Sequence, residues 1–253
     1  MRRVMWIAMV LGLVVGWSGV VAAQSMCGNG RINKNRGEQC DGAKLGGQSC
    51  ESLGFHGGTL VCSATCQFDT SECIRFVDNL DGTLTDSLTG LMWEIKSNDG
   101  SVHDVDNTYT WNTGGTVIPE PGEGTPNGTV FTDFLDVLNN CVSNDGGRTV
   151  RGGFAGYCDW RLSTPAELRT ILQAQFPDCA SSPCVDPAFN TGCTAGCTVT
   201  SCSCTAPSFH WSSVSSADEP FGYANWSANF GEGSVSLVPK GFAYYARAVR
   251  GGQ

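Results

Sequence analysis

Basic residues are scarce in this sequence. Its 253 residues include 15 Lys and Arg against 24 Asp and Glu, which gives a formal net charge of −9 at pH 7. The first 23 positions hold two of the basic residues and no acidic ones, so the remainder carries 13 − 24 = −11. Nucleic acids and anionic membrane surfaces attract proteins of the opposite charge. We therefore expect neither as a partner; the charge fits a soluble extracellular protein, or one that meets cations.

Histidine is also rare, and His56, His103 and His210 lie in separate segments. No two of them have the spacing of metal ligands, and the sequence contains neither H-E-x-x-H nor G-x-S-x-G. A Ser-His-Asp site would have to assemble in space from distant segments. The sequence therefore predicts a protein that is not an enzyme, with no catalytic residues and no organic cofactor.

Long apolar runs are absent except at the N-terminus. Arg2 and Arg3 precede an apolar run from 4 to 21, and small residues precede Gln24. This pattern is typical of a secretory signal peptide over residues 1–23. An uncleaved anchor is the alternative, because the run approaches the ~20 residues of a membrane span. After cleavage we expect no membrane span, and a protein that is secreted, held at the cell surface or periplasmic.

Cysteine, in contrast, is abundant. Six cysteines lie between positions 27 and 73 and eight between 141 and 204. Even clusters in an exported chain indicate disulfides before metal sites or catalysis. We expect all 14 to be paired: Cys27, Cys40, Cys50, Cys62, Cys66, Cys73, Cys141, Cys158, Cys179, Cys184, Cys193, Cys197, Cys202 and Cys204.

The two clusters divide the expected domains. Residues 24–74 have little to bury and need covalent links, although the first six cysteines allow 15 connectivities. Residues 75–253 form the main domain, where Cys179 and Cys184 are close enough to close on each other. The four cysteines from 193 to 204 are expected to pair among themselves, which leaves Cys141 and Cys158 as partners.

The first block resembles a known module. Cys27-Gly-Asn-Gly, Gly-Glu-Gln-Cys-Asp-Gly at 37–42, Leu-Gly-Gly at 45–47 and Cys62-x-x-x-Cys66 are similar to a cysteine-rich repeat of secreted delta-proteobacterial proteins. The resemblance implies an extracytoplasmic spacer or interaction module, sometimes compared with calcium-binding modules. Glu38 and Asp41 would be the calcium ligands here.

The main domain shows signals of short strands and two helices. A hairpin is expected around Asp81-Gly82, a buried strand at 91–93, a helix at 132–141 and a three-stranded antiparallel meander from Trp226 to the end. In DWRLSTPAELRTIL (159–172), Thr164, Pro165 and Glu167 predict a capping box that opens the second helix. Three tryptophans are assigned to the core: Trp93, Trp160 and Trp226.

The order of these blocks resembles a family. NLDGTLTDSLTGLMW, YCDWRLSTPAELRTIL, CVDPAF, HWSS and RAVRGG, taken together, are similar to the Lcl C-terminal domain family over roughly residues 76–252. The resemblance implies an α+β, C-type-lectin-like fold related to formylglycine-generating enzymes. In that group Trp-Arg-Leu-Pro-Thr is a structural signature, and Ser163 stands here in place of the proline. Arg161 is expected to pair with a carboxylate inside the fold, with a ligand contact as the alternative.

The resemblance also suggests function. Formylglycine-generating activity needs a reactive cysteine pair near the C-terminus, and no cysteine follows Cys204. Adhesins that end in this domain suggest sulfated polysaccharide ligands, which the acidic charge puts in doubt unless Arg148 and Arg151 form a basic patch. We expect non-catalytic binding or adhesion to a glycan or surface protein. A structural matrix component without a small ligand is the alternative.

Two sets of site residues follow. Lectin-type sites combine aromatic faces with hydrogen-bonding side chains on loops. The candidates in or beside predicted loops are Tyr109, Trp111, Glu219, Tyr223 and Asn225. Each could equally be a local packing residue, and for Trp111 a core position is the favoured alternative. A calcium site is expected at the clustered carboxylates of Asp78, Asp81 and Asp86, because calcium prefers such oxygens. The same aspartates could instead close Asx-turns.

Overall fold

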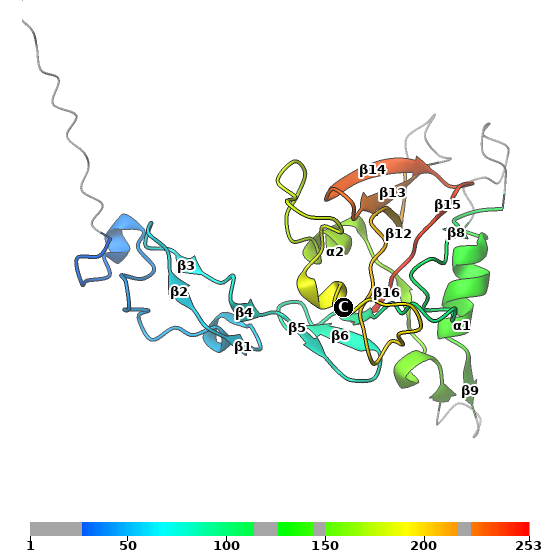
Figure 1. Ribbon diagram of the computed structural model, residues 1–253, viewed down its shortest axis with the longest axis horizontal. Helices are drawn as coiled ribbons and strands as arrows, with labels where there is room; N and C mark the ends of the chain where they lie inside the picture. The colour runs from blue at the N-terminus through cyan, green and yellow to red at the C-terminus, as the bar shows by residue number, and fades with distance from the viewer. Residues whose placement is uncertain (1–26, 114–125, 144–149, 217–223, 253) are drawn as a thin grey trace, which may run out of the picture. The chain divides into compact units, whose positions relative to one another are not determined.

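A computed structural model describes residues 27–113, 126–143, 150–216 and 224–252 (Figure 1). The predicted signal peptide lies outside these residues. By its contacts the chain divides into unit 1, residues 1–47 and 61–69, and unit 2, residues 48–60 and 70–253. The predicted boundary between residues 74 and 75 lies within unit 2. Among the described residues, no helix has the length and apolar composition needed to cross a bilayer.

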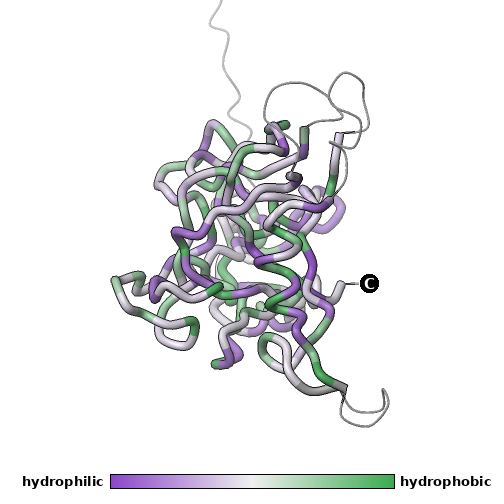
Figure 2. Tube along the Cα trace, turned by 90° about the vertical axis from the view of Figure 1, so that its right-hand side faces the viewer, coloured by the Kyte–Doolittle hydropathy of each residue, from purple (hydrophilic) through white to green (hydrophobic). Residues whose placement is uncertain are grey.

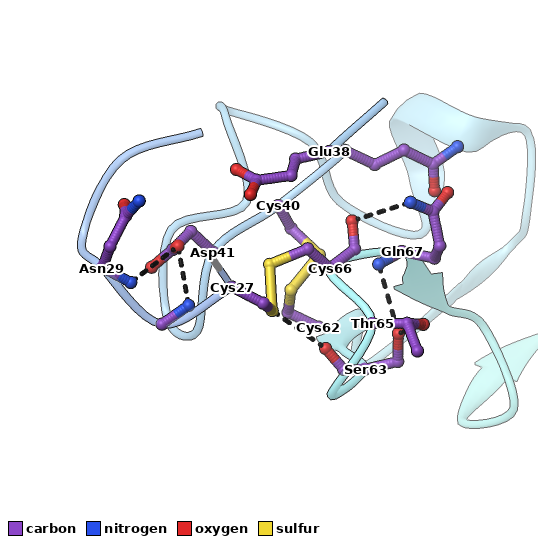
Figure 3. The surroundings of a disulfide bond; sticks show 12 residues. Cys27, Asn29, Glu38, Cys40, Asp41, Cys62, Ser63, Thr65, Cys66 and Gln67 are labelled. Atoms are coloured by element: carbon purple, nitrogen blue, oxygen red, sulfur yellow. Dashed lines mark hydrogen bonds between the residues drawn. A yellow bond between two sulfur atoms is a disulfide. The ribbon is translucent and has the colours of Figure 1, made fainter. Parts of the chain in front are cut away.

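Unit 1 is held by two disulfides, Cys27–Cys66 and Cys40–Cys62. Its elements are a single 3-10 turn η1 (Lys34–Arg36) and a two-residue ribbon of β2 (Val61–Cys62) and β3 (Phe68–Asp69). The Asp41 carboxylate accepts hydrogen bonds from the backbone N–H groups of residues 28, 29 and 30, at 2.8, 3.1 and 2.9 Å; Figure 3 shows the first two. Covalent links and one buried carboxylate thus replace an apolar core here.

Unit 2 begins with a small two-stranded ribbon that a disulfide closes. It comprises η2 (Glu51–Leu53), β1 (Gly57–Gly58) and β4 (Cys73–Ile74), and Cys50–Cys73 closes it. The six early cysteines therefore pair as 27–66, 40–62 and 50–73, one of the connectivities that the sequence left open.

A five-stranded antiparallel sheet forms the centre of unit 2, in the order β11-β16-β7-β6-β5. Its strands are β5 (Phe76–Asp78), β6 (Thr83–Asp86), β7 (Met92–Glu94), β11 (Arg161–Leu162) and β16 (Ala248–Arg250). The predicted hairpin at Asp81-Gly82 and the buried strand at Trp93 are confirmed, and Trp93 pairs with Leu84 and Val249. This sheet joins residues 76–94 to the end of the chain.

A second antiparallel sheet has the order β12-β13-β14. Its strands are β12 (Phe209–Ser215), β13 (Ala224–Asn229) and β14 (Ser234–Pro239). The predicted meander is right for β13 and β14 but wrong for its third strand. That segment splits into β15 (Ala243–Tyr244), which pairs with β8 (Tyr109–Thr110), and β16, which enters the central sheet. Alternation predicts extended structure, but it does not identify the partner strand.

Two helical segments accompany the sheets, as predicted. A π-helical stretch η3 (Val130–Leu135) continues into α1 (Asp136–Leu138), and α2 spans Pro165–Thr170. The helix predicted at 132–141 therefore begins and ends earlier than expected. It ends earlier because Cys141 enters β9 (Cys141–Ser143), which pairs with β10 (Val150–Gly152). The capping box of Thr164 and Glu167 is present in full. Single 3-10 turns lie at η4 (Phe154–Gly156) and η5 (Pro187–Phe189).

The hydrophobic core of unit 2 has two parts. One gathers Trp93, Leu168, Phe189 and Phe230 around the central sheet, and the other gathers Trp111, Phe134, Trp160 and Trp211 beside α1. Figure 2 shows that the hydrophobic stretches of the chain are short and dispersed along the trace, which fits a fold of short strands. Disulfides Cys141–Cys158, Cys179–Cys184, Cys193–Cys204 and Cys197–Cys202 stabilise this unit. The first two pairs are as predicted, and the last four cysteines pair among themselves, in an arrangement that the sequence left open.

The core prediction is wrong for Trp226. Its side chain is 37% exposed, whereas Trp93 and Trp160 are buried. Ala224 and Ala228, two residues to either side on the same face of β13, are both buried, so the small residues of that face are covered while Trp226 between them is not. Its cross-strand neighbour Leu237 is only half-buried. A period of two predicts which face a side chain uses, but not how fully each position on that face is covered.

Candidate functional site

A concave site lies between the β5–β6 hairpin and the disulfide-rich loop that follows η5. We call it the hydroxyl-lined pocket; its volume is about 310 Å³. In Figure 1 the loop is drawn in yellow to gold beside β6. The lining residues are Phe76, Asp78, Leu84, Ile95, Ala188, Thr191, Gly192, Thr200, Ser201, Cys202 and Ser203.

The floor of the hydroxyl-lined pocket is apolar and belongs to the core. Phe76, Leu84 and Ile95 are 7%, 3% and 2% exposed. Phe76 packs edge-on against Phe189, with ring centroids 4.8 Å apart. Because close-packed core side chains seldom move, the floor is a fixed surface.

The wall of the pocket is held by covalent and backbone bonds. Cys193–Cys204 and Cys197–Cys202 cross the loop, and Thr191 and Ser203 exchange two backbone hydrogen bonds of 2.8 Å. The loop also packs directly on the hairpin turn: a Cβ on Gly82, whose φ is +92°, would lie 2.7 Å from Val199 Cγ2. A ligand would therefore meet a wall that is ordered before binding.

Polar groups line the mouth and one side of the pocket. Thr191, Thr200 and Ser201 are exposed hydroxyl residues. Ser203 is 5% exposed, and its Oγ is buried with no hydrogen-bond partner among the described residues. Asp78 is exposed, and its Oδ1 accepts the Leu80 N–H at 2.8 Å. Of the predicted calcium residues, only Asp78 lines this pocket.

The other two predicted calcium carboxylates have structural partners. Asp81 Oδ1 accepts hydrogen bonds from Thr83 N and Oγ1, as in an Asx-turn. Asp86 is fully buried and forms a two-point ion pair with Arg75, at 2.8 and 2.7 Å. Burial alone would raise the pKa of Asp86, but the hydrogen bonds and charge of Arg75 offset this and hold it below its usual value.

In unit 1, Glu38 and Asp41 do lie close together. One oxygen of each carboxylate and the sulfur of Cys66 fall within 4.8 Å of one another. Asp41, drawn beside Glu38 in Figure 3, is already the acceptor of three backbone N–H groups, and Glu38 accepts the Asn33 N–H at 2.6 Å. These bonds give both carboxylates a structural role, and calcium binding here stays a prediction.

The predicted ligand-binding residues do not share an open surface. Tyr109, Trp111 and Asn225 are 8%, 4% and 0% exposed, whereas Glu219 and Tyr223 lie outside the described residues. Tyr109 stacks on the Phe134 ring at 5.1 Å, and burial raises the pKa of its phenol. The same limit applies to the expected basic patch: Arg148 lies outside the described residues, and nothing is described of the Arg151 side chain.

Trp111 lines a second concavity, which we call the apolar groove. Its volume is about 520 Å³, and its lining comprises Trp111, Pro126, Phe131, Leu135, Arg161, Leu162, Thr164, Glu167 and Ser213. The Trp111 indole donates to Ser212 O at 3.2 Å, and the Lys240 ammonium lies 4.7 Å from the ring centroid. Trp111 therefore serves mainly as a packing residue, which was the alternative to its predicted role in ligand binding.

Arg161 also serves the architecture. Its guanidinium forms a two-point ion pair with Glu167 and donates to the carbonyls of Leu162 and Gly251. The expected carboxylate partner is thus Glu167, the capping residue of α2. Burial would raise the pKa of Glu167, but its bonds to Arg161 and Thr164 lower it below its usual value.

A buried ionic cluster was not predicted. Glu94 Oε1 contacts Lys96 Nζ at 2.9 Å and His103 Nδ1 at 2.8 Å, and Oε2 accepts the Ala248 N–H. Arg247 is fully buried and donates to Glu94 O and Cys204 O; burial lowers its pKa to about 10, which leaves it charged at neutral pH. Glu94 ends β7, whereas Lys96 and Arg247 lie just outside β7 and β16; the sequence shows these charges but not that folding buries them together.

Comparison with known proteins gives one family and no individual relative. The model of the Lcl C-terminal domain matches residues 82–250, which include the hydroxyl-lined pocket except for Phe76 and Asp78. No curated protein and no solved structure matches the chain. The seven disulfides are consistent with an extracellular or periplasmic protein. On the extent of the match, two thirds of its residues, the chain belongs to the Lcl C-terminal domain family.

Proposed function

We propose that this chain is a secreted or cell-surface bacterial protein that binds a glycan without transforming it, and that the hydroxyl-lined pocket of unit 2 is the site. One observation carries the proposal: an apolar floor, exposed hydroxyls and a carboxylate meet in a pocket whose wall is cross-linked by disulfides. Carbohydrates present both C–H faces and hydroxyl groups, so a site that pairs apolar surface with a few placed polar groups suits them.

The chemistry of the ionisable groups supports a binding role. The buried carboxylates Asp86 and Glu94 form ion pairs with Arg75 and Lys96, respectively, and His103 Nδ1 lies 2.8 Å from Glu94 Oε1. His210 packs against Phe230 with its ring tilted, and burial holds its pKa well below its ordinary value. These groups stabilise the interior and do not line the pocket.

The cysteines support the same conclusion. All 14 are paired, and no free thiol is found among them. Oxidation of the formylglycine-generating kind requires a reactive thiol, so the pairing of all cysteines supports a binding role rather than this oxidase. An Ellman assay on the native protein should give zero; titratable thiol would favour the oxidase.

A glycan array tests the proposal directly. Oxidised residues 24–253 should bind one group of related glycans in a concentration-dependent manner, and reduced, alkylated protein should not. Uniform silence of the oxidised protein across neutral and acidic glycans would contradict glycan recognition and favour a structural role at the cell surface.

A further inference from the structure

We infer that the hydroxyl-lined pocket takes a single uncharged pyranose at the end of a glycan chain, and that Asp78 and Ser203 are its polar anchors. The inference rests on the proposed function and narrows it to one class of ligand and two contact residues. From the sequence alone, neither residue was expected to bind carbohydrate.

The volume of the pocket limits the size of the ligand. Small-molecule sites in proteins range from ~300 to 1,000 Å³. At about 310 Å³ the hydroxyl-lined pocket lies at the lower end of that range. It has room for one sugar ring, and the rest of an oligosaccharide would extend into solvent.

The charge of the lining excludes anionic sugars. Asp78 is the only ionisable side chain among the lining residues, since the Cys202 sulfur is in a disulfide. No lysine or arginine lines the pocket to neutralise a sulfate or a uronic carboxylate. An anion would meet the Asp78 carboxylate instead, and like charges repel at short range. Neutral hydroxyls are attracted, because hydrogen bonds to a carboxylate are short and strong.

Asp78 keeps a free oxygen for this purpose. Its Oδ1 holds the Leu80 N–H, while Oδ2 has no hydrogen-bond partner among the described residues. The bond to Leu80 N fixes the carboxylate at the pocket mouth, so a ligand hydroxyl meets an oriented acceptor.

Ser203 supplies the second anchor. Buried polar groups are nearly always hydrogen-bonded, and those that are not need an explanation. The Ser203 Oγ is buried without a partner in the pocket wall, on a backbone that is bridged to Thr191. The residue lines the pocket, and once its side chain turns toward the cavity a sugar hydroxyl can pair with Oγ, while the C–H face of the ring covers Phe76, Leu84 and Ile95.

The test measures binding of methyl glycosides by isothermal titration calorimetry on residues 24–253. The probes are the neutral methyl glycosides of glucose, galactose, mannose and N-acetylglucosamine, each with its own uronic and 6-sulfated form as charged counterparts. At least one neutral glycoside should bind, and its charged counterparts should bind at least about tenfold more weakly.

Three substitutions and one control test the anchors. Asp78→Asn keeps an acceptor for Leu80 N and should weaken binding about tenfold or more, because a charge-assisted hydrogen bond is lost. Ser203→Ala should weaken binding but leave the melting temperature of the free protein unchanged or higher, because an unpaired hydroxyl is removed. Thr200→Trp should fill the pocket mouth and abolish binding. Asp81→Asn changes an equivalent turn carboxylate outside the pocket and should bind like the wild type.

The outcomes separate the inference from the proposed function. Glycan binding that survives both Asp78→Asn and Thr200→Trp, in variants that melt like the wild type, would place the site elsewhere and overturn the inference alone. Preference for the sulfated or uronic probes would also overturn it while glycan recognition stands. If neither the array nor any glycoside gives binding, both are refuted.

Discussion

Arg161 and Glu167 form a two-point ion pair across the turn that leads into α2, with Nη2–Oε1 at 2.7 Å and Nη1–Oε2 at 2.9 Å. The same Glu167 accepts the Thr164 N–H at 2.7 Å and completes the capping box. One carboxylate therefore joins β11 to the start of α2. The stretch DWRLSTPAELRTIL is thus a structural anchor in this fold.

Glu167→Ala should destabilise unit 2 by about 2–3 kcal/mol, because it removes a capping bond and leaves a half-buried guanidinium without its carboxylate. Urea denaturation followed by tryptophan fluorescence measures this. Glu232→Ala, at an exposed turn, should stay within about 0.5 kcal/mol of the wild type. Equal effects of the two substitutions would remove the special role of Glu167.

Glu94→Ala should cost about 3–5 kcal/mol, because it leaves Lys96 and Arg247 charged, buried and without a counter-ion. The double variant Glu94→Leu, Lys96→Met should recover part of that loss, since an apolar pair needs no compensation. Chemical denaturation of the single and double variants tests the coupling. A single substitution that costs less than about 1 kcal/mol would show that the cluster contributes little.

Stability should fall at acid pH through Asp86. Arg75 holds the pKa of Asp86 below its usual value in the folded protein. A lowered folded pKa stabilises the protein above the unfolded pKa of about 3.9, and this contribution is lost as the pH falls through the lower folded value. Asp86→Asn should therefore show a smaller loss of unfolding free energy between pH 5 and pH 2 than the wild type. Identical acid slopes would contradict the role of the ion pair.

Unit 1 should unfold without unit 2 when Cys27 and Cys66 are both changed to serine. The bond closes a separation of 39 residues, and its loss should cost about 4 kcal/mol. All tryptophans after the signal segment lie at or beyond Trp93, so fluorescence reports on unit 2 alone. Hydrogen exchange should show loss of protection in residues 27–47 and 61–69 while the tryptophan emission is unchanged. A shift in that emission would show that the two units depend on each other.

Several features were decided locally and could be predicted from the sequence. Thr164, Pro165 and Glu167 lie within one turn, so their spacing alone predicts the capping box. Cys179 and Cys184 are near neighbours, and Asp81-Gly82 lies at a hairpin turn; both predictions are confirmed. The pairing of Cys141 with Cys158 could be predicted by elimination once the other cysteines were grouped, and it is confirmed.

Tertiary structure decided which strands pair, which side chains are buried and which residues share a pocket. The last predicted strand of the meander pairs instead with β8 and β7, because the partner of a strand depends on which other edges are free nearby. Trp226 is exposed and Tyr109 buried, since burial depends on what covers a residue from elsewhere in the chain. Asp78 and Ser203 are 125 positions apart in the sequence. They line the same pocket only because the sheet and the disulfide-rich loop fold against each other, which no local pattern predicts.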